Sequence, residues 1–266
     1  MYPFEMTKPL TIADASAQLR NEDAQAIAGG QTLIPTLKQR LAAPEILVSL
    51  TDIAEMKGVC ENAAGQLCIG AATTHAQIAR DGGRLPALAA LAGQIGDPAV
   101  RNRGTIGGSI ANNDPSACYP AAALGCRATI ITENRSIAAD DYFQGLFTTA
   151  LDENELVTEI RFDVPQIAYY QKFVQPASRF ALVGVFVAKF ADGVRVAVTG
   201  ASEDGVYRWS EAETALTNHF DPAALGDITH TPDGMIADLH GSVEYRAHLV
   251  QVMTTRAVTA ALSSVS

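Results

Sequence analysis

The sequence predicts an α+β fold in three parts, at residues 1–55, 56–163 and 168–266. Three observations predict it. In the first two parts, short apolar runs typical of strands alternate with helix-compatible segments. In the third part, Asp192-Gly193 separates two apolar runs, which is the signal of a β-hairpin. The chain then ends in a segment whose apolar residues recur near the helical period, so it should pack as a helix on that hairpin.

The first part is expected to be a small α/β unit. Its predicted elements are a helix that includes 16–20, strands at 25–28 and 46–49, and a helix over most of 33–41 after Pro35. The first strand runs into a glycine turn, Ala28-Gly29-Gly30-Gln31-Thr32. This turn should open onto a helix N-terminus, where unpaired N–H groups and the helix dipole favour a phosphate.

The second part is expected to mix helices and strands. Predicted strands lie at 66–70, 128–132, 135–138 and 155–162, and predicted helices at 74–80, 85–94 and 119–124. Thr73 or Thr74 should cap the helix at 74–80. A second glycine turn, Thr105-Ile106-Gly107-Gly108-Ser109, precedes the helix at 119–124.

The third part is expected to contain a sheet covered by a helix. Its predicted elements are strands at 181–190 and 194–200 and a helix at 243–262. The segment 226–241 between them is polar and rich in turn residues, and we expect a mobile loop there.

Each glycine turn combines a Gly-Gly step with a hydroxyl residue. Glycine tolerates positive φ and lets the backbone approach a ligand closely, so successive N–H groups can converge on phosphate oxygens. Two such turns would suit a pyrophosphate, although a plain turn is the alternative for each. Neither turn fits the Rossmann or P-loop pattern, so a dinucleotide site of another design is predicted. Arg101 and Arg103 precede the second turn, and we favour salt bridges with Asp97 over phosphate contacts for them.

Composition disfavours several functions. The formal net charge is -10 and the lysines and arginines form no stripe, so nucleic acid is not an expected partner. The sequence lacks the long apolar run of a membrane span, and Met1–Glu5 lacks a signal-peptide pattern, so we expect a cytoplasmic protein without membrane insertion.

The sequence offers no metal ligands and no catalytic residues. Its four cysteines form no C-x-x-C pair, and its five histidines lack the spacing of a metal-binding pair. It also lacks a G-x-S-x-G motif. Because no side chains in the sequence are recognisable as catalytic, a bound cofactor is favoured as the source of any chemistry.

Segments along nearly the whole chain resemble the FAD-binding medium subunit of molybdenum hydroxylases. They are AIAGGQTLIPTLKQRLAAPEILVSL, IGAATTHAQIA, IGDPAVRNRGTIGGSIANNDPSACYPAAALG, KFVQPASRFALVGVFVAKF and SVEYRAHLVQVMTTRAV. The sequence is similar to aerobic carbon monoxide dehydrogenase medium subunits and, more distantly, to the flavin domain of xanthine dehydrogenase. This resemblance implies a two-part FAD-binding domain of the vanillyl-alcohol-oxidase-like type, a small α/β C-terminal domain, and a short helix within 140–147.

The resemblance also implies which residues hold FAD. The implied residues are Ala28, Gly29, Gly30, Gln31, Thr32 and Leu33 in the first turn, Thr105, Ile106, Gly107, Gly108 and Ser109 in the second, and Asp114 and Val157 beyond them. Thr32, Thr105 and Ser109 either donate to phosphate or cap a helix, and Asp114 either binds near the adenosine or caps its own turn. Ile106, Ile110 and Val157 either pack on the ligand or belong to the core.

Two further positions are singled out by the resemblance. Phe180, in the segment expected to approach the isoalloxazine, shields the ring or belongs to the core. Cys118 stands where many relatives carry an Asp that binds a ribose hydroxyl, which weakens the expectation for the adenosine end of the site.

The implied function is electron transfer within a complex. A large subunit with molybdenum–molybdopterin would oxidise the substrate, a small subunit with two [2Fe–2S] clusters would pass electrons on, and FAD here would deliver them to an external acceptor. A dimer of such heterotrimers is expected. The alternatives are a self-contained flavin oxidoreductase, whose candidate groups are Tyr169, Tyr170 and Lys172, and a scaffold subunit without flavin. Replacing Gly107 with Val is expected to abolish flavin retention in a chain that still folds.

Overall fold

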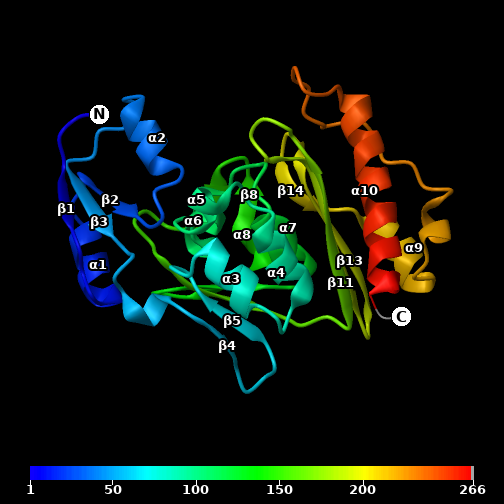
Figure 1. Ribbon diagram of the computed structural model, residues 1–266, viewed down its shortest axis with the longest axis horizontal. Coiled ribbons are helices and arrows are strands. Elements are labelled where there is room, and N and C mark those ends of the chain that lie inside the picture. The colour runs from blue at the N-terminus through cyan, green and yellow to red at the C-terminus, as the bar shows by residue number, and fades with distance from the viewer. Residues whose placement is uncertain (265–266) are drawn as a thin grey trace.

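The structure is a computed structural model that describes residues 1–264. Its elements form three groups along the long axis of the molecule, each built on its own sheet (Figure 1). The predicted α+β class is confirmed, because every group combines strands with helices. No helix among these 264 residues has the length and apolarity that crossing a membrane requires.

The first group is a parallel sheet with two helices. It consists of β1 (Glu5–Thr7), α1 (Ile12–Leu19), β2 (Ala24–Ile27), α2 (Leu33–Lys38) and β3 (Ile46–Ser49), with strand order β1-β3-β2. The middle strand β3 is buried at Leu47 and Val48, which point to opposite faces. Both predicted strands and both predicted helices are confirmed. Strand β1 was not predicted, because its three residues are largely exposed and carry no apolar pattern.

The second group surrounds an antiparallel sheet in the order β4-β5-β10-β6-β7. Its strands are β4 (Val59–Glu61), β5 (Leu67–Gly70), β6 (Thr129–Thr132), β7 (Ser136–Ala138) and β10 (Val157–Phe162), and a separate hairpin contains β8 (Phe143–Gly145) and β9 (Thr148–Thr149). Its helices are the 3-10 turn η1 (Ala54–Met56), α3 (His75–Asp81), α4 (Pro86–Gly93), α5 (Pro98–Arg101), α6 (Ile106–Asn112), α7 (Tyr119–Gly125) and α8 (Ala139–Tyr142). Thr74 caps α3 by accepting from the Gln77 N–H, as predicted.

One prediction in this group is wrong. The second glycine turn is not a turn, because α6 begins at Ile106 and includes Gly107, Gly108 and Ser109. The short helix expected within 140–147 is present as α8, but it ends at Tyr142, and the hairpin β8–β9 follows it. Asn113 at the C-terminal end of α6 holds that hairpin by donating to the carbonyls of Gly145 and Thr148. This distant hydrogen-bond partner stabilises a hairpin that local sequence does not predict.

The third group is an antiparallel sheet in the order β11-β12-β13-β14. Its elements are β11 (Ile167–Val174), β12 (Ala181–Phe190), β13 (Gly193–Ser202), β14 (Gly205–Arg208), α9 (Ser210–Asn218), the 3-10 turn η2 (Pro222–Leu225) and α10 (Val243–Ser263). The predicted hairpin is confirmed, and Gly193 provides its positive φ of 152°. The predicted terminal helix is α10, whose Leu249, Val250 and Met253 pack with the valines of β12 and β13.

The loop 226–241 is irregular, as predicted, but it is tied to the sheet. The Ile236 N–H donates to the Ala201 carbonyl, and buried Arg246 pairs with Asp238. The same guanidinium donates to the carbonyls of Leu182 and Gly200. The later part of the loop is therefore anchored to β13 and to α10.

All seven residues of α7 are buried, and this helix of the second group faces the sheet of the third group (Figure 1). Gly125 lies so close to the Phe186 ring that an added Cβ would stand 2.8 Å from it. Tyr119 and Phe186 belong to one hydrophobic core, which joins the first group to β11, β12 and β13. Apolar side chains of one core therefore fill the space between the groups, except where the cavity described next interrupts them.

Candidate functional site

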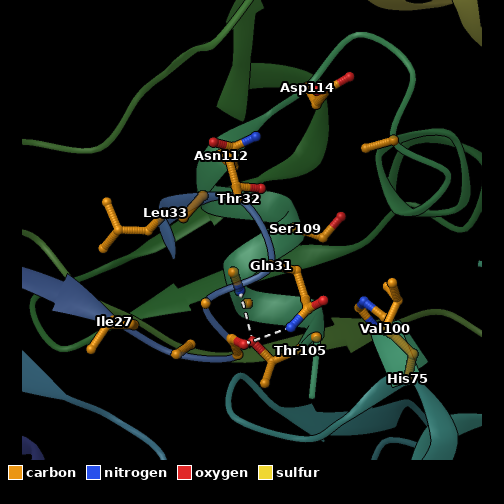
Figure 2. Close-up of a pocket in the computed structure, with 18 of the residues that line it drawn as sticks. Ile27, Gln31, Thr32, Leu33, His75, Val100, Thr105, Ser109, Asn112 and Asp114 are labelled. Carbon is orange, nitrogen blue, oxygen red and sulfur yellow. Dashed lines mark hydrogen bonds between the residues drawn. The ribbon is translucent and has the colours of Figure 1, made fainter. Parts of the chain in front are cut away.

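A cavity of about 720 Å³ lies where the three groups meet. The first group contributes the segment that connects β2 to α2, which we call the first loop (residues 28–33). The second group contributes the start of α6 and the segment after β5, and the third contributes Lys172 and residues 178–180. Figure 2 shows Gln31, Thr32, Thr105 and Ser109 gathered around the space between the first loop and α6.

The first loop lines this cavity and leaves several backbone N–H groups without an acceptor among residues 1–264. Gly30 has a φ of 70°, which turns the chain from β2 into α2, so the predicted helix N-terminus is confirmed. Within residues 1–264, the N–H groups of 29–32 donate to no acceptor, and the Thr32 side chain does not cap α2. The Gln31 side chain donates to the Gly29 carbonyl, which keeps that carbonyl from facing an anion. Four consecutive free donors beside a helix N-terminus suit a phosphate group.

The start of α6 is arranged differently. The Ile106 and Gly107 N–H groups donate to the carbonyls of Thr73 and Ala71, so neither is available to a ligand. Thr105 Oγ1 accepts from the Gly108 N–H at 3.2 Å, which is the capping role that the sequence left open. Backbone amides of this segment therefore contribute less than expected. What it offers the cavity is the bare surface of Gly108 and the Ser109 hydroxyl.

The two segments touch through glycine. A Cβ on Gly29 would stand 2.1 Å from the carbonyl oxygen of Arg103 and 2.7 Å from the Cα of Gly104. The first loop can approach the α6 segment this closely only because residue 29 has no side chain. The contact brings segments of the first and second groups to one part of the cavity.

Alanine at Gly29 is expected to separate the two segments. Because the obstructing atoms are backbone, Gly29→Ala should lower the free energy of unfolding by about 2 kcal/mol and weaken binding of FAD, the ligand that the resemblance implies. Chemical unfolding and a flavin titration measure the two effects. The matched control is Gly83→Ala, since that glycine is exposed and an added Cβ meets nothing within 4 Å. Equal behaviour of the two variants would contradict the role given to Gly29.

All the predicted site residues except Ile106 line the cavity. Ile106 is fully buried in the core, as is Ile110 one helical turn later. These two residues of α6 therefore belong to the core, which was one of the two alternatives left open by the sequence. Asp114 lines the cavity, but its Oδ1 accepts from the Ser116 N–H and caps its own turn. Val157 at the start of β10 and buried Cys118 also line it.

The arginines before α6 are structural. Arg101 donates to the carbonyls of Ile95 and Gly96 rather than to a carboxylate. Asp97 caps α5 through the Val100 N–H, so the predicted salt bridge is absent from the ion pairs of residues 1–264. Arg103 is exposed and contributes its backbone to the contact with Gly29. The structural role is therefore shown for the Arg101 side chain, through carbonyl groups instead of the predicted salt bridge.

Sequence reasoning assigned no role to His75 in this site. Its Nδ1 lies 3.2 Å from the Tyr119 hydroxyl, and Gly104 packs against its ring. Burial, reinforced by nearby Arg101, lowers the pKa of His75 to about 4, so the ring is neutral at pH 7. No local sequence pattern marks this histidine, because its partners Gly104 and Tyr119 are far away in the sequence.

The pKa of His75 predicts an acid dependence of stability. In the unfolded chain this histidine takes up a proton near its ordinary pKa of 6.5, and in the native chain only near a pKa of about 4. Between these values the unfolded chain binds more protons, so stability falls as the pH falls. His75→Asn should flatten that fall by up to about 1.4 kcal/mol per pH unit. Unfolding curves from pH 7 to 4 measure it, and exposed His219→Asn is the control; parallel curves for wild type and His75→Asn would refute it.

The charges on the cavity wall are few. Glu155 is held by Arg135 and Thr132, and the hydrogen bond from Arg135 lowers its pKa to about 2, so this carboxylate is already compensated. Arg179 is exposed at the mouth beside Phe180, which is 52% exposed. The first loop thus offers hydrogen-bond donors to an anion, and much of the remaining cavity wall is apolar. An elongated molecule with a central pyrophosphate fits this distribution.

Comparisons with known proteins match this picture. Residues 2–166 match the protein family described as FAD binding domain in molybdopterin dehydrogenase. The carbon monoxide dehydrogenase medium chain of Afipia carboxidovorans is 34% identical over 96% of this chain and 95% of its own length. The nicotine 6-hydroxylase medium subunit of Paenarthrobacter nicotinovorans is 32% identical over 94% of both chains. A solved structure of carbon monoxide dehydrogenase from Hydrogenophaga pseudoflava superposes with a TM-score of 0.87, at 32% identity and 98% coverage of both chains.

Proposed function

Because the chain belongs to the family of FAD binding domains in molybdopterin dehydrogenases, we propose that it is the FAD-binding, electron-transferring subunit of a molybdenum-containing hydroxylase. The resemblance on which the sequence analysis rested is thereby confirmed. The observation that carries the site is the contact of Gly29 with the Arg103–Gly104 backbone. The four N–H groups of the first loop that lack an acceptor among residues 1–264, with Gly108 and Ser109 on the wall of the same cavity, support a pyrophosphate site here.

The residues of this chain bind and orient the cofactor. The N–H groups of 29–32 donate to the pyrophosphate, with the Ser109 hydroxyl facing them from α6. We place the adenosine toward Val157 and the isoalloxazine toward Phe180, Ile95 and Lys172, where the third group closes the cavity. Bound FAD supplies the capacity to take up electrons from one partner and pass them to an acceptor.

We propose that the electrons come from partner subunits. The relatives named above are medium chains, so this chain works beside a large molybdenum-binding subunit and a small iron–sulfur subunit. A dimer of such heterotrimers and a cytoplasmic location are the further parts of this proposal. The three sheets support the proposed division into an FAD-binding region in two parts, 1–55 and 56–163, and a C-terminal domain, 168–266.

The alternative of a self-contained oxidoreductase has little support. Such an enzyme needs an acid or base beside the ring, and of its three candidate groups Tyr169 and Tyr170 do not line the cavity. Tyr170 is buried against Phe186 instead. The scaffold alternative has less support still, since the free N–H groups of the first loop have no structural partner among residues 1–264.

Native purification tests the proposal. The protein is isolated from its own cells, its visible absorption spectrum is recorded, and the accompanying chains are separated on a denaturing gel. Flavin and iron–sulfur absorption with one larger and one smaller chain would support the proposed function. A yellow protein that turns over a substrate alone would favour the self-contained enzyme, and a colourless protein would refute the FAD assignment.

A further inference from the structure

Lys172 is the one buried cation among the described residues of the cavity wall. It lies on β11, its residue is 9% exposed, and its Nζ donates to the Gln94 carbonyl at 3.1 Å. Within residues 1–264 it pairs with no carboxylate. An ammonium group has three donors, so one carbonyl leaves its capacity largely unused.

Such a group is costly to bury without a negative partner. Gln94 is the C-terminal cap of α4, and the carbonyl end of that helix offsets part of the charge. A single helix end is a weak partner for a full charge removed from water. The remaining donors of Lys172 are therefore available to a ligand in the cavity.

The other ionisable groups of the wall are already satisfied or neutral. Glu155 is paired with Arg135, Asp114 caps its turn, and His75 is neutral at pH 7. Arg179 is exposed to solvent. A negative charge that develops on a ligand in the buried part of the cavity thus meets Lys172 as its nearest uncommitted cation.

Lys172 also stands apart from the proposed pyrophosphate site. The first loop belongs to the N-terminal group and β11 to the C-terminal group, which lie on opposite sides of the second group (Figure 1). Ile95, Gly96 and Phe180 line the same end of the cavity as Lys172. This is the end at which the proposed function places the isoalloxazine.

Resting on that proposed function, we propose that Lys172 Nζ lies against the pyrimidine edge of the isoalloxazine and stabilises the negative charge that the ring gains on reduction. Two electrons and one proton convert the neutral oxidised ring to an anion, whose charge is shared by N1 and the adjacent carbonyl oxygen. The electrons come from the iron–sulfur partner and the proton from solvent. Lys172 forms no bond and transfers no proton, and it acts by charge alone.

The test compares three variants of the FAD-loaded chain with wild type. Lys172→Gln removes the charge and keeps a donor for Gln94, Lys172→Arg keeps the charge, and Lys189→Gln removes a lysine that does not line the cavity. The readouts are FAD affinity, the two-electron reduction potential, and the affinity for sulfite. Sulfite adds to oxidised flavin and leaves a negative charge on the ring, so its affinity reports the cation beside the ring.

Lys172→Gln is expected to weaken sulfite binding about tenfold or more, and to lower the two-electron reduction potential by about 30 mV for each factor of ten by which the reduced ring is destabilised relative to the oxidised ring. FAD affinity should change much less, and Lys172→Arg and Lys189→Gln should resemble wild type. Should Lys172→Gln fail to fold, Lys172→Met fills the buried space without charge and replaces it in the comparison with Lys172→Arg.

Two results would overturn the inference. Unchanged sulfite affinity and potential in a Lys172→Gln protein that retains FAD would show that the charge does not act on the ring. A large loss of FAD affinity with unchanged ring properties would make Lys172 a phosphate ligand. If wild type itself binds no FAD, the proposed function fails first, and the inference fails with it.

Discussion

Valine at Gly108 is expected to weaken FAD binding about a hundredfold in a chain that still folds. Gly108 is exposed on the cavity wall, and an added Cβ would stand 3.0 Å from Thr105 Oγ1 and 3.8 Å from the Ala28 Cβ. The added methyl groups would occupy the space in which a pyrophosphate meets the first loop. Loss of two hydrogen bonds to a charged group costs about 3 kcal/mol, which is about a factor of a hundred in affinity.

The measurement is a titration of the flavin-free chain with FAD, followed by protein fluorescence. Thermal unfolding of the same samples shows whether the fold is intact. Gly83→Val is the matched control, because that glycine is exposed and does not line the cavity. Wild-type affinity in Gly108→Val would remove the α6 segment from the pyrophosphate site.

Valine at Gly107 is expected to have the opposite profile. A Cβ there would stand 2.5 Å from the Ala71 Cβ and 2.7 Å from the Ala71 carbonyl oxygen, inside the core. The Gly107 N–H also donates to that carbonyl, so the backbone cannot move away without losing the bond. The free energy of unfolding of the flavin-free chain should therefore fall by about 3 kcal/mol.

This expectation replaces the one drawn from sequence, in which Gly107→Val folded and only lost its flavin. Urea unfolding of both glycine variants without FAD distinguishes the two views. Gly108→Val is the control, since Gly108 is the next residue of α6 and faces the cavity instead of Ala71. A Gly107→Val chain as stable as wild type would show that Ala71 can move aside.

The fold was predictable where one element carries its own signal. The apolar strands β3, β5, β12 and β13 and the long helix α10 were identified from pattern alone. Elements that depend on distant partners were not. The hairpin β8–β9 relies on Asn113, and the short edge strands β1, β4 and β14 rely on neighbours that supply their pairing. Hydrogen bonds of this kind leave no mark on local composition.

The residues that line the cavity were predictable from the sequence, whereas the role of each of them was predictable to a smaller extent. Glycine is needed both where a ligand approaches and where two chain segments approach each other, and sequence cannot separate these causes. Gly29 and Gly107 meet protein, while Gly108 faces the cavity. Lys172 was identified only as a possible acid or base, because its burial and its lack of a carboxylate partner follow from packing between the second and third groups.

Because α7 is buried by the third sheet, the segment that matches the family is not a segment that can fold independently. The match ends at residue 166, before the sheet that covers this helix. A polypeptide cut there would expose the side of α7 that packs on β12 and β13, including the space filled by Phe186. The matched segment needs the following sheet to cover the apolar side of α7. It therefore cannot be exchanged alone between proteins. Gene fusions or engineered chimeras of this protein should therefore join after α10, and the flavin site should travel with its C-terminal sheet.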